Sequence, residues 1–278
     1  GFALQLGVFR YPGRVLKAGE VIPEPVCRFV AAQLGLKPDD LLPYAAREKT
    51  RREHLDALRK MYGYKMFSGK RAKKLRGWLD RNAEAAQSSQ ALVRGFVEEC
   101  RRQQIILPGT SVIERHCADA LVAAERRIEA RIAARLDANT RAKLDKLLAE
   151  EVDGRVSRFV WLRRFEVGKN SADINRQLDR LEFLQRLALP PAILDDIPAH
   201  RVVQLRRQGE RYFTDGLRDI TSDRRLAILA TCVVEWSAAI ADTVVETHDR
   251  IVGSIWREAK KICDARVAEA QSEIATTL

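Results

Sequence analysis

Apolar residues recur every three or four positions along most of this 278-residue chain, the spacing that gives a helix one buried face. The longest such stripe begins at Ser222 and, if unbroken to Thr276, would be roughly 80 Å long at about 1.5 Å per residue. A break between His248 and Gly253 is an equal alternative. Because no segment sustains an alternation of polar and apolar residues, we predict an all-α, multi-helical fold with a long C-terminal helix.

Shorter helices are expected upstream. In the first of them, Val26, Phe29, Val30 and Leu34 form the apolar face and Gly35 ends the helix. Further helices are predicted at about 50–62, 70–83, 88–104, 110–136, 137–152 and 171–189. Residues 157–165 fit either a strand or a buried helix, since period alone does not separate the two.

The helices are predicted to form two or more subdomains. We expect an N-terminal helical domain over 1–105, a helical linker or second subdomain over 106–153, and a C-terminal helical domain over 154–278. Asp153 and Gly154 are the strongest boundary signal between the last two. Three tryptophans, Trp161, Trp236 and Trp256, lie at spacings typical of a core and are expected to pack inside it.

Charge is concentrated in one stretch. Residues 44–81 hold thirteen Lys and Arg against four Asp and Glu, a net charge of +9, whereas the whole chain carries +11. Such a concentration is typical of a surface that binds a polyanion. Tyr and Trp residues interleaved with the charge indicate a folded module, because disordered basic tails are poor in aromatics.

Two helices should carry this basic stretch. Thr50 and Glu53 fit a capping box that would start the first, and Gly63 would end it. The second, from Lys70 to Ala83, has an apolar stripe on one side and cations on the other, so the pair resembles a helix-turn-helix reader with a longer loop. The predicted DNA-contacting residues are Arg47, Lys49, Arg51, Arg52, His54, Arg59, Lys60, Lys65, Lys70, Arg71, Lys73 and Lys74. For His54, packing beside Trp78 is an equal alternative to a phosphate contact.

The residues give little support for a nucleotide-binding loop, an enzyme or a metal site. The run from Gly63 to Lys70 looks like a phosphate loop, but it has one residue too many between its glycines and Arg71 where Ser or Thr must hold magnesium. The histidines and acids show no ligand spacing or catalytic grouping, so we predict no enzyme, metal or cofactor in this chain.

The five cysteines lack paired spacing and are expected to be buried and reduced, as in a cytosolic protein. No stretch approaches eighteen uncharged apolar residues, so no membrane span is expected.

Several phrases resemble the N-terminal region of the replicative transposases of the Tn-three family. They are GFALQLGVFRYPGR at the start, VAAQLGL at 30–36, Tyr44 through Arg47 to TRREHL at 50–55, Gly63-Tyr64, Trp78-Leu79, ILPG at 106–109 and Trp161-Leu-Arg. The opening and the phrase ending at Leu55 are the more specific. The chain also begins without Met and on an apolar run, so we interpret it as a fragment.

The resemblance implies a function. In that family the N-terminal region binds the terminal inverted repeats of the transposon, and a C-terminal domain with three acidic residues and magnesium cuts and joins strands. This chain would then be a sequence-specific double-stranded-DNA-binding part of a bacterial, cytoplasmic and nucleoid-associated transposase, active in DNA transposition and recombination of a transposable element. A homodimer would form through the full-length protein. The alternative is a helical scaffold whose basic stretch docks an acidic protein partner.

Overall fold

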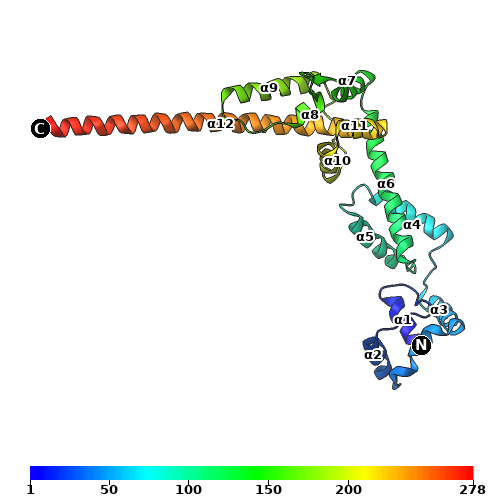
Figure 1. Cartoon of the computed structure of the whole chain (residues 1–278). Helices are drawn as coiled ribbons and strands as arrows, with labels where there is room; N and C mark the ends of the chain where they lie inside the picture. The colour runs from blue at the N-terminus through cyan, green and yellow to red at the C-terminus, as the bar shows by residue number, and fades with distance from the viewer. Residues whose placement is uncertain (278) are drawn as a thin grey trace. The chain divides into compact units, whose positions relative to one another are not determined.

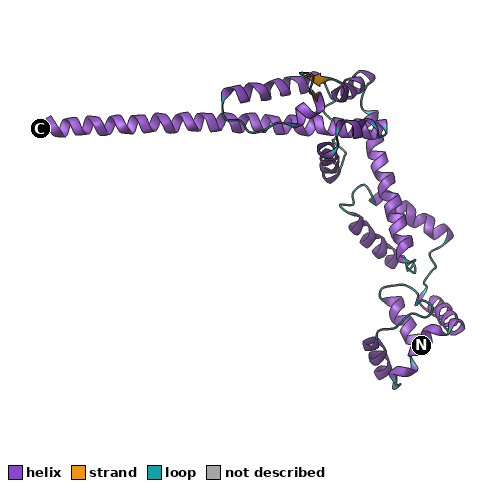
Figure 2. Ribbon diagram, viewed as in Figure 1, coloured by secondary structure: helices purple, strands orange, loops and turns teal. Residues whose placement is uncertain are grey.

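The chain folds almost entirely into helices, as predicted. The computed structural model describes the backbone of residues 1–277 and the side chains of residues 1–272. Figure 2 shows the helices and one small antiparallel hairpin, formed by β1 (Glu151–Val152) and β2 (Val156–Ser157). The all-α fold class is therefore confirmed.

Residue contacts divide the chain into two compact units, one from Gly1 to Glu125 and one from Arg126 onward. The long helix α6 (Thr110–Ala134) contributes residues to both. The predicted boundary pair, Asp153 and Gly154, forms the tip of the hairpin inside the second unit, with both residues at positive φ. The division into three parts stays a prediction.

The first unit contains two separate hydrophobic cores. Its elements before α6 are α1 (Phe2–Arg10), α2 (Glu24–Leu34), the 3₁₀ turns η1 (Pro38–Asp40) and η2 (Leu42–Ala46), α3 (Glu48–Tyr62), α4 (Gly69–Asn82) and α5 (Ser89–Arg102). We call the core around Leu4, Leu16 and Leu41 the N-terminal core. We call the core formed by α4, α5 and the start of α6, with Leu75 and Phe96 at its centre, the middle core.

Helix α2 exists where predicted and ends at Gly35 in the left-handed conformation, but of its expected apolar face only Val30 packs on the N-terminal core. Cys27 and Ala31 are the buried residues, whereas Phe29 is 64% exposed and Val26 and Leu34 are also exposed. One residue of offset rotates a helix face by about 100°. The N-terminal core therefore covers Cys27, Ala31 and part of Val30, while the other three predicted side chains lie in solvent.

The capping box predicted for α3 is also wrong. The helix begins at Glu48, and its first backbone hydrogen bond runs from the Arg51 amide to the Arg47 carbonyl at 3.0 Å. Thr50 is therefore inside the first turn, where its hydroxyl cannot cap the helix start. The predicted start of a helix at residue 137 is confirmed, and the Asp137 carboxylate caps α7 (Ala138–Ala149) by accepting from the Thr140 amide at 2.6 Å.

The second unit is built around the first half of its last helix. Its elements after the end of α6 are α7 (Ala138–Ala149), the hairpin, α8 (Arg158–Arg163), α9 (Ser171–Arg186), α10 (Ala199–Arg211), α11 (Thr214–Arg218) and α12 (Ser222–Thr277). Figure 1 shows α9 lying along α12, and Leu226, Leu229 and Ile240 of α12 are buried in the shared core. The segment left open between strand and helix forms helix α8 after the short strand β2.

Helix α12 continues without a break for 56 residues, so the alternative of a break near residue 250 is wrong. At about 1.5 Å per residue it is about 84 Å long. Trp236 is 1% exposed and packs on Phe159, but Trp256 is 71% exposed, so the expectation that all three predicted core tryptophans pack inside is wrong for Trp256. Burial ends where α12 extends past α9 and α10.

By length and composition alone, α12 is also apolar enough to cross a membrane, with a mean hydropathy of 1.6 in its most apolar window. Half of that window is buried inside the protein. A helix at the centre of a folded core has the same composition, so this property is weak evidence for a membrane span.

Candidate nucleic-acid interface

The basic stretch lies on α3, α4 and the connection between them, as predicted, but these two helices pack on different elements. The main contacts of α3 are with α1 and η2, whereas α4 packs on α5. A helix-turn-helix reader requires its two helices to pack on each other. The stretch therefore links two cores, and the predicted packing of α3 on α4 is not what the described residues show.

Helix α4 separates its charges from its core face. Ala72, Leu75 and Leu79 are buried in the middle core. Four exposed cations stand opposite that stripe at the helical spacing i, i+3, i+4 and i+11: Lys70, Lys73, Lys74 and Arg81. Arg71 and Arg76, also exposed, flank them. The result is a cationic face on the side of α4 opposite its core.

Close packing holds this face in place. A Cβ added at Gly95 of α5 would lie 3.0 Å from Cη2 of Trp78, so the two helices approach closely where glycine leaves room for the indole. Ser68 precedes α4 in an extended conformation and its side chain makes no capping hydrogen bond. The Arg71 amide donates to the Ser68 carbonyl at 3.2 Å, so the amides of Gly69 and Lys70 are the ones that can face solvent or an anion.

Helix α3 presents a second, smaller set of cations. Lys49, Arg52 and Lys60 are exposed, as is Arg47 just before the helix. Arg52 forms an ion pair with Glu48 at 3.2 Å, with both side chains about three-quarters exposed. Exposed pairs of this kind contribute little to stability, so Arg52 can exchange its carboxylate for a phosphate at low cost.

Three of the predicted contact residues on α3 face the protein instead. Arg51 donates through Nη1 to the Leu16 carbonyl at 2.9 Å, and Arg59 is half-buried and paired with Asp56 at 3.0 Å. His54 lies 3.0 Å from the Tyr44 hydroxyl through Nδ1 and stacks on the Tyr44 ring. The alternative that His54 packs beside Trp78 is wrong, because its ring packs against Tyr44 and Phe2.

The connection between α3 and α4 is fixed by its backbone. Lys65 donates its amide to the Gln104 carbonyl at 2.9 Å, and its own carbonyl accepts from the Ile106 amide at 2.9 Å. These bonds form an isolated parallel bridge between Lys65 and Ile105. The Lys65 side chain remains exposed, so it adds a cation to the same stretch.

Two residues of this surface were missing from the predicted set. Arg76 and Arg81 are exposed on α4 with the predicted lysines. Helical spacing alone would have found Arg81, which lies seven residues after Lys74 and hence on the same side of the helix. We call the exposed cations of residues 47–81 the basic surface.

The thiols offer no alternative site. Cys27, Cys100, Cys117 and Cys232 are buried and free, and burial raises the pKa of the Cys100 thiol to about 12. Cys263 is exposed, so the prediction that every cysteine is buried is wrong for this one. Among the described residues, no group of three or more His, Cys, Asp or Glu side chains is arranged to hold a metal ion.

Comparison with known proteins finds relatives that match this chain along nearly its whole length. Residues 1–120 match the family model described as a domain of unknown function, DUF4158. The chain is 34% identical over 94% of its length to the transposase for transposon Tn3926 of Escherichia coli, and 33% identical over 94% to the transposase for transposon Tn501 of Pseudomonas aeruginosa. A more distant relative, the transposase for transposon Tn1546 of Enterococcus faecium, is 26% identical over 94%. The chain spans about a quarter of the length of each of these proteins.

Proposed function

Since the predicted resemblance to the replicative transposases of the Tn-three family is confirmed over 94% of the chain, we propose that this chain is the DNA-recognition part of such a transposase. Its ligand is the double-stranded terminal inverted repeat of the transposon. In the full-length protein, catalysis belongs to a further domain that binds magnesium through acidic residues. The protein acts in the bacterial cytoplasm at the nucleoid.

The observation that carries this proposal is the basic surface. Residues 44–81 hold +9 of the chain's net charge of +11, and α4 arranges its cations opposite a buried stripe. Phosphate contacts from such cations supply most of the affinity of DNA-binding proteins and fix their register on the duplex. Arginine side chains on the same helix, Arg71 and Arg76, have the bidentate geometry that reads guanine edges.

Because α3 packs on α1 whereas α4 packs on α5, we propose that they contact the duplex as two separate elements. The cations of α4 form the larger contact, and the exposed cations Arg47, Lys49, Arg52 and Lys60 form the smaller one. Arg51, Arg59 and His54 support the local structure of α3 and its contacts with the rest of the first unit.

Sequence preference provides the decisive test. The chain would be titrated by fluorescence anisotropy against a labelled duplex carrying the terminal repeat of its own transposon and against a scrambled duplex of equal length and composition. We expect tighter binding to the repeat, because base contacts add to a shared phosphate contribution. Equal affinities for the two duplexes would remove the claim of sequence recognition.

The rival function, docking of an acidic protein partner, predicts a different result. A scaffold of that kind would bind neither duplex in the nanomolar to micromolar range at physiological salt. Salt sensitivity alone does not separate the two functions, since both weaken with ionic strength.

A further inference from the structure

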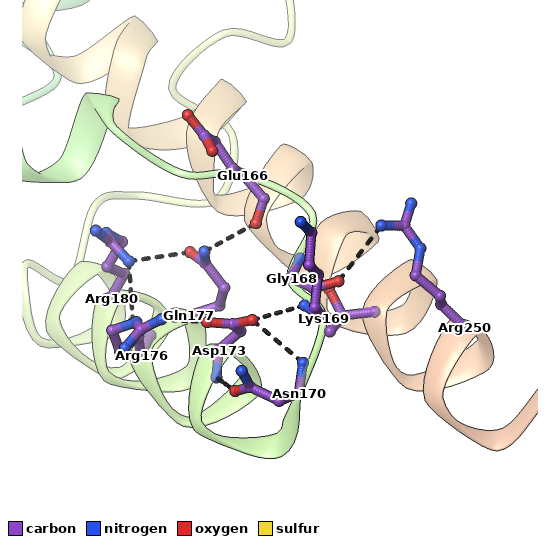
Figure 3. A network of polar contacts seen from close by, with 10 residues as sticks. Glu166, Gly168, Lys169, Asn170, Asp173, Arg176, Gln177, Arg180 and Arg250 are labelled. Atoms are coloured by element: carbon purple, nitrogen blue, oxygen red, sulfur yellow. Dashed lines mark hydrogen bonds and ion pairs between the residues drawn. The ribbon is translucent and has the colours of Figure 1, made fainter. Parts of the chain in front are cut away.

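A second cationic site lies in the second unit, far along the chain from the basic surface. The segment between α8 and α9 and the first turns of α9 enclose a cavity of about 280 Å³. Its lining includes four cations, Arg164, Lys169, Arg176 and Arg180, together with the acidic residues Glu166 and Asp173. Figure 3 shows most of these residues in one network of polar contacts.

Arg180 is the unusual member of this group. It is only 9% exposed, and its guanidinium donates to three neutral oxygens: the carbonyls of Trp161 at 3.2 Å and Arg176 at 3.3 Å, and Oε1 of Gln177 at 3.2 Å. It also lies over the Trp161 ring, 5.0 Å from the centroid. Burial lowers the pKa of this guanidinium, yet arginine keeps its proton in proteins. The exposed Asp179 carboxylate favours the charge from nearby, but the hydrogen bonds given above all go to neutral oxygens. A buried charge hydrogen-bonded in this way gains from an added anion.

The two acids in the lining do not supply that anion. The Asp173 carboxylate accepts from the backbone amides of Lys169 at 2.6 Å and Asn170 at 3.2 Å, and it also binds Arg176. These bonds complete the capping box that starts α9. Glu166 contributes its carbonyl, which accepts from Nε2 of Gln177 at 3.1 Å, while Figure 3 shows its carboxylate directed away from Gln177.

The wall of the cavity is anchored to α12. The Gly168 amide donates to Oγ1 of Thr247 at 3.0 Å, and its carbonyl accepts from Nη1 of Arg250 at 3.5 Å. A Cβ at position 168 would lie 2.2 Å from Cβ of Asp173, so only glycine fits this close approach. The backbone that carries Lys169 is therefore held against α12 before any ligand arrives, which lowers the cost of ordering this segment on binding.

We propose that this cavity binds a phosphate group, with Arg180 at its base and Arg164 and Lys169 at its mouth. Guanidinium groups recognise phosphate oxygens through paired N–H donors, and a lysine ammonium adds a point charge. The phosphate belongs either to a DNA backbone or to a small phosphorylated molecule. The site is independent of the basic surface, because it uses none of its residues.

Binding of inorganic phosphate to the whole chain, measured by isothermal titration calorimetry in chloride buffer of matched ionic strength, tests the proposal. We expect saturable binding of one phosphate per chain. Loss of a hydrogen bond to a charged group costs about 1.5–3 kcal/mol, which corresponds to a fall in phosphate affinity of about tenfold or more. Arg164→Ala with Lys169→Ala should show at least that fall, and both side chains are exposed, so the fold should survive.

Two further variants make the result specific. Arg180→Met, checked for folding by circular dichroism, should abolish phosphate binding, whereas Arg186→Ala, an exposed arginine of the same helix outside the cavity, should leave it unchanged. A chain altered only at Lys73 and Lys74 should also bind phosphate normally. The phosphate measurement therefore tests this cavity independently of whether the basic surface binds DNA. Wild-type chain without saturable phosphate binding, or a folded Arg180→Met with unchanged affinity, would overturn the proposal.

A competition experiment separates the two sources of phosphate. If the site takes a DNA phosphodiester, the cavity variants should also weaken duplex binding and free phosphate should compete with the duplex. If it takes a small phosphorylated molecule, phosphate binding should be lost in the variants while duplex affinity stays at the wild-type level. Both results support a phosphate site and assign its natural ligand.

Discussion

Replacing Lys73 and Lys74 with alanine should change the salt dependence of DNA binding by a calculable amount. Both lysines are exposed on the outer face of α4, away from the buried stripe, so their removal should leave the fold intact. Each phosphate neutralised by a cation releases counterions, and log K falls with log salt by about 0.9 per contact. Six to nine such contacts on the basic surface give the wild-type chain a slope of roughly −5 to −8.

The double variant should therefore lose about 1.8 from the absolute slope. Extrapolated from a common affinity at 1 M salt, this corresponds to binding about 60-fold weaker at about 0.1 M and about ninefold weaker at about 0.3 M. The change in slope alone therefore fixes the loss of affinity at every salt concentration, so measurements at several concentrations must all agree with it.

The assay is fluorescence anisotropy with a labelled duplex at four or more chloride concentrations. Lys260→Ala with Lys261→Ala is a matched control, because these are also adjacent exposed lysines on a helix, and it should keep the wild-type slope. If the Lys73 and Lys74 variant keeps the wild-type slope, α4 does not contact phosphates. If the control pair shows the larger change, the DNA lies along α12 instead.

Three further predictions concern the fold. Gly168→Ala would place its Cβ 2.2 Å from the Asp173 side chain, so thermal unfolding should show that the free energy of unfolding falls by about 1–3 kcal/mol. Gly253 lies inside α12 and a Cβ there meets nothing within 4 Å, so Gly253→Ala should raise the free energy of unfolding by about 0.5–1 kcal/mol. The hydrogen-bonded guanidinium of Arg14 lowers the pKa of Glu20 from 4.5 to about 2, so the stability this carboxylate contributes is present above pH 4.5 and lost as pH falls towards 2. Acid unfolding of Glu20→Gln should accordingly converge with that of the wild type near pH 2, and a constant difference at all pH values would contradict the assignment. A thiol reagent at pH 8 should modify Cys263 fast and the buried thiols slowly, and Cys263→Ser should remove the fast phase.

Sequence periodicity predicted the helices well because a helix is specified by contacts within four residues. The all-α class, the ends of α4, the start of α7 at Asp137 and the long final helix were all readable in this way. The basic surface was readable for the same reason, since its cations repeat at helical spacing on the side opposite an apolar stripe.

Which face of a helix is buried was less predictable, because it depends on what packs against the helix. In α2 the small residues Cys27 and Ala31 are buried in place of the larger Phe29, and Trp256 lies on α12 beyond the elements that cover Trp236. The pattern shows that an apolar face exists, but a partner from elsewhere in the chain decides whether that face is covered.

The tertiary structure alone decided how the two candidate sites are assembled. The sequence determined that residues 44–81 are helical and cationic, but only the tertiary structure shows that α3 packs on α1 whereas α4 packs on α5. The phosphate cavity could not be read from the sequence, because it depends on Arg180 being buried and on Gly168 being fixed by Thr247, 79 residues later. Local spacing determines which side chains share a helix face, whereas contacts between distant segments determine which charges are buried and which groups surround them.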